Sequence, residues 1–303
     1  MKNGENTMVG HIACFVAYVI FGLNIIVTKD IMTTEIISPM ALFCLRSLGA
    51  GLLFWLSSLF VPSEKILPSD YIKIFAASVT GFFLTQITFL VGISDITPMD
   101  CSIMTSLSPI YTMFIAAVVL KEPITLKKAG GVLLSFMGVL FLIFNSVSSG
   151  GGAAETKPIG VFFMFLNGFC FSIYLGVFKP LIMRYSVITF MKWIFLFSSL
   201  MSLPFVGGEL VHVDYASLPL GFVAEISYAI IFATFISYFL IPIGQKHLRP
   251  TLVSMYSYMQ PIVATAISIC IGMDTLGWKK VLAAATVFTG VVLVNYSRAA
   301  RRR

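Results

Sequence analysis

The 303-residue chain is 58% apolar and 11% charged, whereas about a quarter of the residues of a soluble globular domain are charged. This composition and a mean hydropathy of +0.96 exclude the soluble globular class. Apolar runs of about 20 residues, the length at which a helix crosses the ~30 Å hydrocarbon layer, fill most of the chain. The sequence therefore predicts an integral membrane protein.

Charged residues, prolines and glycine clusters divide the chain into ten apolar segments. Because hydrocarbon offers the backbone no hydrogen-bond partner, each segment is predicted to be a helix, and the period-two alternation of barrel strands is absent from the sequence. The first segment is too long for a cleaved signal peptide. The predicted helices cover residues 8–28, 36–60, 71–93, 99–120, 128–147, 158–178, 187–206, 219–243, 250–272 and 277–297.

Lysine and arginine residues predict the orientation. With the N-terminus in the cytoplasm, 15 of the 20 basic residues fall on the inner side, and four remain outside: Lys29, Lys157, Lys279 and Lys280. The remaining one, Arg46, lies within a helix. The positive-inside rule then places both termini in the cytoplasm. The net charge of +7 is thus a topology signal, and the basic C-terminal tail is predicted to lie against anionic lipid and to bind no nucleic acid.

The chain carries an internal repeat. Residues 121–142 (KEPITLKKAGGVLLSFMGVLFL) and 273–294 (MDTLGWKKVLAAATVFTGVVLV) match at an offset of 152, which also places Pro109 over Pro261. FGLNIIVTK at 21–29 matches FSIYLGVFK at 171–179 at an offset of 150.

Each copy of the repeat holds five predicted helices. Because five is odd, the second copy enters the membrane from the opposite side, an arrangement typical of transporters that alternate access. The predicted fold is an all-α membrane protein with ten transmembrane helices as two inverted five-helix repeats. The first repeat covers residues 1–147, an external linker covers 148–157, and the second repeat with its cytoplasmic tail covers 158–303.

In this order and at these spacings, the motifs resemble the EamA-type members of the drug/metabolite transporter superfamily, over nearly the whole chain. The marks are Gly22-Leu23-Asn24 and Lys29, Pro39 and Arg46, Pro109 followed by KEPITLKKAGGVLL, and Gly138. The chain departs from the pattern in residues 187–206, where no arginine matches Arg46. The resemblance implies a central cavity lined by helices 1 to 4 and 6 to 9, with helices 5 and 10 bracing the outside.

Two charged residues within the spans are candidates for function. Arg46 lies roughly 15 Å along its helix at 1.5 Å per residue, where a charge needs a partner or water. It is predicted either to bind a carboxylate or phosphate of the solute, or to form a structural pair with Glu225, with Asp100 as another acid in range. Glu225 lies about two turns into its helix and is predicted either to couple transport to a proton gradient or to be an interfacial carboxylate.

Uncharged polar residues within the spans need hydrogen-bond partners, which a wet cavity or a neighbouring helix supplies. With Arg46, the residues predicted to bind the solute are Asn24, Gln86, Tyr111, Tyr174, Tyr238 and Gln260. Pro109 and Pro261 remove backbone hydrogen bonds at matching places and are predicted to be hinges.

Other classes of function are less well supported. HExxH and GxSxG motifs are absent from the sequence, so an intramembrane enzyme is not predicted, and neither is a metal site or a cofactor. A passive channel or a lipid scramblase also fits the hydropathy, but inverted repeats with broken helices favour a carrier. The prediction is a secondary transporter of a small metabolite, such as an amino acid, in the cell (plasma or inner) membrane; export is what the resemblance implies.

Overall fold

The computed structural model describes residues 2–96, 101, 104–147, 157–206, 218–270 and 278–296, and within these residues no strand is present. This confirms the all-helical prediction. Six helical stretches are long and apolar enough to cross a membrane: Thr7–Thr33, Pro39–Phe60, Pro68–Ser94, Pro158–Val177, Val187–Pro204 and Leu220–His247. Two shorter apolar helices cover Ser108–Val119 and Val281–Val294. The count of ten crossings stays a prediction.

In the first half of the chain, up to residue 147, proline stands at the start of α2, α3 and α6. Ser38 caps α2, because its side chain accepts a hydrogen bond from the backbone N–H of Ala41 at 3.1 Å, and a proline follows as the first helical residue. The elements of this half are α1 (Lys2–Thr33), α2 (Pro39–Ser57), η1 (Ser58–Phe60), α3 (Pro68–Ser78), η2 (Val79–Phe83), α4 (Leu84–Ser94), α6 (Ser108–Val119) and α7 (Leu126–Val147).

The second half, from residue 158, repeats this use of proline, which begins α8 and α14. Its elements are α8 (Pro158–Val177), α9 (Lys179–Arg184), α10 (Val187–Val206), α12 (Leu220–Ile230), η3 (Ile231–Ile236), α13 (Ser237–His247), α14 (Pro250–Met255), η4 (Tyr256–Tyr258), α15 (Met259–Cys270) and α16 (Trp278–Asn295). The predicted helix 250–272 is therefore divided into shorter pieces.

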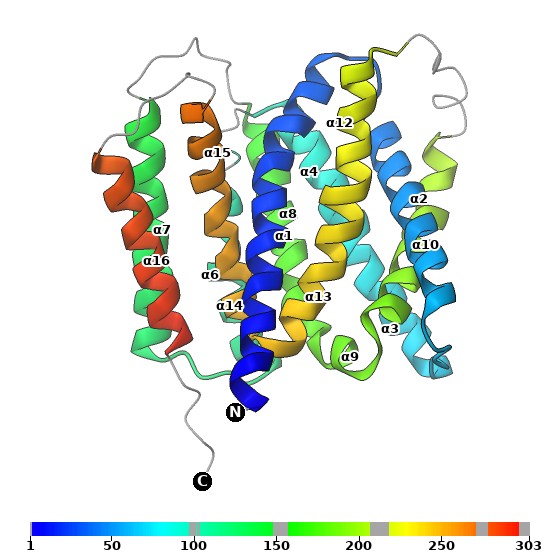
Figure 1. The fold of residues 1–303 in the computed structure, drawn as a ribbon, viewed down its shortest axis with the longest axis horizontal. Coiled ribbons are helices and arrows are strands. Elements are labelled where there is room, and N and C mark those ends of the chain that lie inside the picture. Colours follow the sequence, from blue (N-terminus) through cyan, green and yellow to red (C-terminus); the bar gives the residue numbers. More distant parts are fainter. Residues whose placement is uncertain are drawn as a thin grey trace.

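Helices α7 and α16 lie side by side at one edge of the molecule (Figure 1). Small residues bring their backbones together: a Cβ atom added to Gly131 would lie 2.7 Å from the carbonyl oxygen of Gly290. The hydroxyl of Ser135 donates to the carbonyl of Val287 at 3.0 Å. This close contact is typical of helix pairs in membranes. It agrees with the expectation that these two helices brace the outside.

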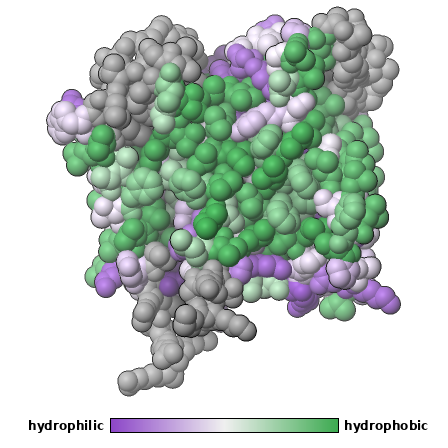
Figure 2. Space-filling view, in the orientation of Figure 1, coloured by the Kyte–Doolittle hydropathy of each residue, from purple (hydrophilic) through white to green (hydrophobic). Residues whose placement is uncertain are grey.

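The outer surface between the helix ends is apolar. Hydrophobic residues cover a broad band across the molecule, and hydrophilic residues gather toward its upper and lower ends (Figure 2). Leu52, Phe114, Phe162 and Leu200 are among the large exposed apolar side chains. Such a surface suits contact with lipid chains, because a soluble monomer rarely exposes a continuous apolar area of this extent.

Equivalent helices of the two halves run in opposite directions. Lys29, near the end of α1, donates to the carbonyls of Ile93 and Ile96 at 2.8 and 3.1 Å, at the end of α4. The residue before α8, Lys157, contacts the same place, with its backbone N–H 2.9 Å from the carbonyl of Asp95. Since α1 ends where α8 begins, these two helices are antiparallel in the fold (Figure 1).

The opposite end of the molecule has an equivalent lysine contact. Lys179, which is 150 positions after Lys29, donates to the carbonyl of Leu248 at 2.5 Å, just past the end of α13. Leu248 is itself 152 positions after Ile96. A lysine at a helix C-terminus is favourable because it satisfies carbonyls without helical partners. Burial lowers the pKa of Lys179, whereas the hydrogen bond to the Asp95 carboxylate raises the pKa of Lys157.

Candidate functional site

A polar cavity lies at the centre of the helices, with a volume of about 70 Å³. Residues from both halves line it, on α1, α2, α4, α6, α8, α13 and α15, in η4, and beside the turn before α6. The lining residues are Tyr18, Phe21, Asn24, Ile25, Arg46, Thr85, Gln86, Phe89, Thr105, Ser108, Asn167, Phe171, Tyr238, Ser257 and Gln260. Their mixture of amide, hydroxyl and aromatic groups suits a small solute that has both polar and apolar parts.

Many lining residues are equivalents of one another in the two halves. Gln86 lies 152 positions before Tyr238, and its side-chain nitrogen donates to the Tyr238 hydroxyl at 2.7 Å. A second equivalent pair, Ser47 and Ser199, is joined by a hydroxyl hydrogen bond of 3.1 Å. Because equivalent residues touch where the two halves meet symmetrically, these pairs lie near the axis that relates the halves.

Two π-helical segments precede the cavity residues Gln86 and Tyr238. The segments η2 and η3 begin 152 positions apart, and each is followed by a hydroxyl that donates to the carbonyl five residues earlier. The Thr85 hydroxyl lies 2.5 Å from the Thr80 carbonyl, and the Ser237 hydroxyl lies 3.0 Å from the Phe232 carbonyl. Because π turns are rare and occur frequently at functional sites, this matched pair makes the cavity the candidate functional site.

Helix breaks also occur at matching positions. A turn at residues 106–107 precedes α6, and η4 separates α14 from α15. Two equivalent pairs of lining residues come from these breaks, Thr105 with Ser257 and Ser108 with Gln260. Pro109 and Pro261 begin the next helical pieces and have no N–H for the carbonyl four residues earlier. A role of both prolines as hinges stays a prediction.

Arg46 is 1% exposed and lines the cavity. Its Nε donates to the Thr234 hydroxyl of η3 at 2.8 Å, and that hydroxyl donates its own hydrogen to the carbonyl of Ala229 at 2.7 Å. The Nη1 atom of Arg46 has no hydrogen-bond partner, and the ion pairs of the described residues do not include Arg46. Arg46 thus stands in the cavity wall without a counter-charge from the described part of the chain.

Unpartnered polar atoms concentrate in this cavity. Nine buried side-chain nitrogen or oxygen atoms of the described residues have no hydrogen-bond partner, and five of them belong to lining residues. An unpaired buried polar atom is unfavourable by about 1–3 kcal/mol, so such atoms are rare unless a ligand or water completes them. The five atoms are Asn24 Oδ1, Arg46 Nη1, Gln86 Oε1, Ser257 Oγ and Gln260 Oε1.

Two of the residues predicted to bind the solute lie outside the lining. The ring of Tyr111 packs against Phe165 and Phe169 of α8, with centroids 5.4 and 6.4 Å apart. The ring of Tyr174 is buried between Gly81 of η2 and Phe171, behind the cavity wall. The other predicted residues line the cavity: Asn24, Arg46, Gln86, Tyr238 and Gln260.

Glu225 lies on α12 beside Asp30, near the end of α1, and away from the cavity lining. It is therefore not the partner of Arg46 that the sequence suggested. Asp100, the other acid considered, lies outside the described residues. Proton coupling through Glu225 stays a prediction.

Several lining residues were not predicted from the sequence, among them Tyr18, Thr105 and Ser257. Asn167 donates to the carbonyl of Thr85 at 2.7 Å, beside the first π segment. The internal repeat could have indicated Ser257 as a lining residue. At an offset of 152, Ser257 matches Thr105 and Gln260 matches Ser108, so polar residues occur at equivalent positions of both halves.

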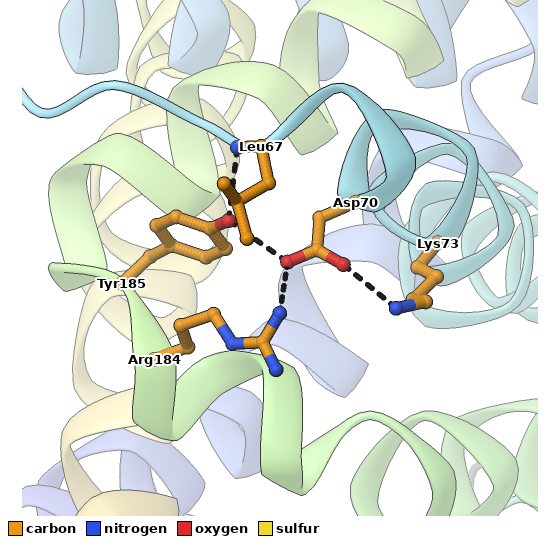
Figure 3. Close-up of polar contacts among 5 residues, drawn as sticks. All are labelled: Leu67, Asp70, Lys73, Arg184 and Tyr185. Atoms are coloured by element: carbon orange, nitrogen blue, oxygen red, sulfur yellow. Dashed lines mark hydrogen bonds and ion pairs between the residues drawn. The ribbon is translucent and has the colours of Figure 1, made fainter.

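A cluster of charged and polar residues joins the halves at the end where α3 begins (Figure 3). The Asp70 cluster consists of Leu67, Asp70, Lys73, Arg184 and Tyr185. The buried carboxylate of Asp70 accepts from Lys73 at 2.7 Å, from the Tyr185 hydroxyl at 2.8 Å and from Arg184. The Tyr185 hydroxyl accepts from the backbone N–H of Leu67 at 3.2 Å.

Next to the Asp70 cluster, Glu64 accepts from the backbone N–H of Ser186 at 2.8 Å. These contacts tie residues 64–73 of the first half to residues 184–186 of the second. A charged carboxylate that is buried and fully partnered stabilises one arrangement of the two halves, and separating them would strand it.

Long apolar helices surround a central cavity that is lined by equivalent residues of two related halves, an arrangement that defines a multi-pass membrane protein with an internal cavity. A model of the EamA-like transporter family matches the chain twice, over residues 8–144 and 158–296. The chain belongs to the EamA-like transporter family, and the resemblance inferred from the sequence is confirmed.

Relatives and a solved structure agree with this assignment. The chain is 22% identical to an uncharacterized transporter of Archaeoglobus fulgidus, over 88% of this chain and 92% of the relative. It is also 22% identical to the uncharacterized inner membrane transporter YicL of Salmonella typhimurium, over 98% and 99%. A crystal structure at 16% identity has the same fold, with a TM-score of 0.73 over 96% of each chain.

Proposed function

We propose that the protein is a secondary carrier that moves a small organic solute across the cell membrane by alternating access. The observation that carries this proposal is the central cavity, whose lining residues carry five unpartnered polar atoms and come from two halves with matched π segments and helix breaks. A carrier needs such a site near the midplane and two halves that can exchange conformations around it.

The size of the cavity fits a carrier in a contracted state. Its volume is about 70 Å³, whereas a cavity that accommodates benzene measures roughly 150 Å³. A solute larger than this space enters when helices move apart. At the π segments and at the breaks before α6 and α15, the backbone hydrogen bonds of a regular α-helix are already interrupted. Rearranging the backbone there therefore requires less free energy than elsewhere in these helices.

The proposal includes ten crossings as two inverted five-helix repeats, both termini in the cytoplasm, and export across the plasma or inner membrane. The antiparallel directions of α1 and α8 and the equivalent lysine contacts at opposite ends support the inversion. The excess of basic residues on one side supports the orientation.

Solute counterflow in proteoliposomes tests the carrier function. Vesicles loaded with a high concentration of a substrate should accumulate labelled external substrate transiently and with saturation. A passive channel would equilibrate the label without this overshoot, and a scramblase would move labelled lipid instead. Protein-free vesicles are the control, and equilibration without overshoot for every transported solute contradicts the proposal.

Cysteine labelling tests the orientation. Lys157→Cys and Lys65→Cys each place a thiol at an exposed position, in a background in which the exposed Cys270 is replaced by serine. An impermeant thiol reagent applied to intact cells should label Lys157→Cys and should label Lys65→Cys after lysis. The reverse pattern would invert the proposed orientation.

A further inference from the structure

We propose that the cavity binds a small organic solute through a single carboxylate, which lies against the guanidinium of Arg46. This inference rests on the proposed carrier function, because it names the chemical class of the solute. Arg46 is the one charged residue among the lining residues that the structure describes.

Among the described residues, no acid pairs with Arg46. The acids with described partners are engaged at the helix ends: Asp70 with Lys73 and Arg184, Glu122 with Lys128 at 2.7 Å, and Asp95 with Lys157 at 2.6 Å. Glu225 lies beside Asp30. A guanidinium stays protonated in proteins, so burial leaves a full positive charge that needs an anion.

The contacts of Arg46 hold its guanidinium in one orientation. The Thr234 hydroxyl has one hydrogen, which it donates to the carbonyl of Ala229, and it therefore accepts from Nε of Arg46. With Nε engaged on this side, Nη1 remains for a ligand. A planar guanidinium fixed at Nε and open at Nη1 is suited to a carboxylate oxygen.

Charge balance selects among ligands. A cationic solute would be repelled by Arg46, and a phosphate dianion would leave one negative charge uncompensated in a low-dielectric site. Chloride would neutralise Arg46 but offers no hydrogen to the amide oxygens of Asn24, Gln86 and Gln260, which have no donor. An organic carboxylate that also carries an N–H or O–H group satisfies both requirements.

Matched small probes test this inference on the purified full-length protein by thermal shift. Glycolate, glycolamide and ethanolamine share a hydroxyl and differ in carrying an anionic, a neutral or a cationic group; glycine adds an ammonium donor to the carboxylate. Glycolate should raise the melting temperature most, glycine should raise it less because its ammonium adds a positive charge, and glycolamide and ethanolamine should not raise it. Equal stabilisation by glycolamide, chloride or methyl phosphate, or none by either carboxylate, overturns the inference.

Substitution locates the site. Arg46→Gln should weaken carboxylate binding at least about tenfold, because a charge-assisted hydrogen bond is lost. Arg249→Gln, at the start of α14 and away from the cavity lining, is the matched control and should keep the binding. Carboxylate stabilisation that survives Arg46→Gln unchanged overturns the inference.

A labelling measurement covers the case in which Arg46→Gln does not fold. Ser257→Cys, a nearly isosteric change, places a thiol in the cavity, and glycolate or glycine should slow its reaction with a thiol reagent more than glycolamide does. Equal protection by glycolamide overturns the inference. The carrier function and the carboxylate site can fail separately. Counterflow of a neutral or cationic solute would support the carrier function and contradict the carboxylate site. Carboxylate binding without counterflow would support the carboxylate site and contradict the carrier function.

Discussion

The two halves of the chain are alike in their backbone irregularities and unlike in their charge. Both have a π segment closed by a hydroxyl, a broken helix before a proline, and a lysine at a helix C-terminus. At the position equivalent to Arg46 the second half has Ser198, whose hydroxyl shares a hydrogen bond of 2.7 Å with Ser78.

This difference separates two tasks. Features present in both halves can exchange their conformations when access alternates, so they are suited to movement. A feature present in one half cannot be exchanged, so Arg46 is suited to binding one end of the solute, whichever side the cavity opens to.

The largest expected effect comes from removing the unshared charge. Arg46→Met keeps the length and apolar stem of the side chain, so transport should fall to background. Because Arg46 has no acid partner in the described structure, the melting temperature should stay level or rise. Transport and melting should be measured on the same purified protein. A fall in stability of about 3–5 kcal/mol would show a buried structural pair instead, and would contradict this assignment.

Removing the shared hydroxyls should have a smaller, matched effect on transport. Thr85→Val and Ser237→Ala each leave one π-segment carbonyl without its side-chain donor. Both variants should fold, and each should change the counterflow rate several-fold in the same direction, because the segments are equivalent. Ser227→Ala, which removes an exposed hydroxyl bond on α12, is the control. A change in one variant alone would break the equivalence of the halves.

Proton coupling can be tested at Glu225, a carboxyl group that lies outside the cavity lining. Glu225→Gln is expected to keep solute counterflow and to abolish the response of net transport to an imposed pH gradient, because the amide cannot carry the proton. Asp95→Asn, at the end of α4, is the matched control. If net transport in Glu225→Gln still follows the pH gradient, the coupling group lies elsewhere.

The smallest expected effect concerns the hydrogen bond between the halves. Tyr238→Phe removes the acceptor of the Gln86 amide, and should destabilise the protein by about 1–3 kcal/mol because a buried donor is left unpaired. Gln86→Leu combined with Tyr238→Phe should recover part of this loss, since both polar partners are then absent. Additive losses in thermal melting of the double variant would show that the two side chains do not act as a pair.

The helical fold was predictable from the long apolar runs. The repeat was predictable because proline, glycine and lysine recur at nearly constant offsets in the two halves. An offset of 152 links Pro109 with Pro261, and an offset of 150 links Lys29 with Lys179. The π segments were not predictable, because no residue type in 79–83 or 231–236 encodes an extra backbone residue per turn. They depend on how the helices pack around the cavity.

The site was predictable in part. Asn24, Arg46 and Gln86 are conspicuous because amide and guanidinium groups are rare in apolar helices, and the structure places them in the lining. The lone hydroxyls of Thr105 and Ser257 carry little signal in single segments. No described acid lies beside Arg46, because Glu225 contacts Asp30 instead. Contacts between such distant elements cannot be read from spacing along the chain.

Locking the end that carries the Asp70 cluster tests alternating access most directly. Glu64→Cys with Ser186→Cys places two thiols where the carboxylate of Glu64 now lies 2.8 Å from the Ser186 nitrogen. In the Cys270→Ser background, joining them with a short cross-linker ties the halves together. Each single variant treated with the same cross-linker is the control. We predict that counterflow stops on cross-linking and returns when the link is cleaved; full counterflow through the cross-linked protein would contradict the account.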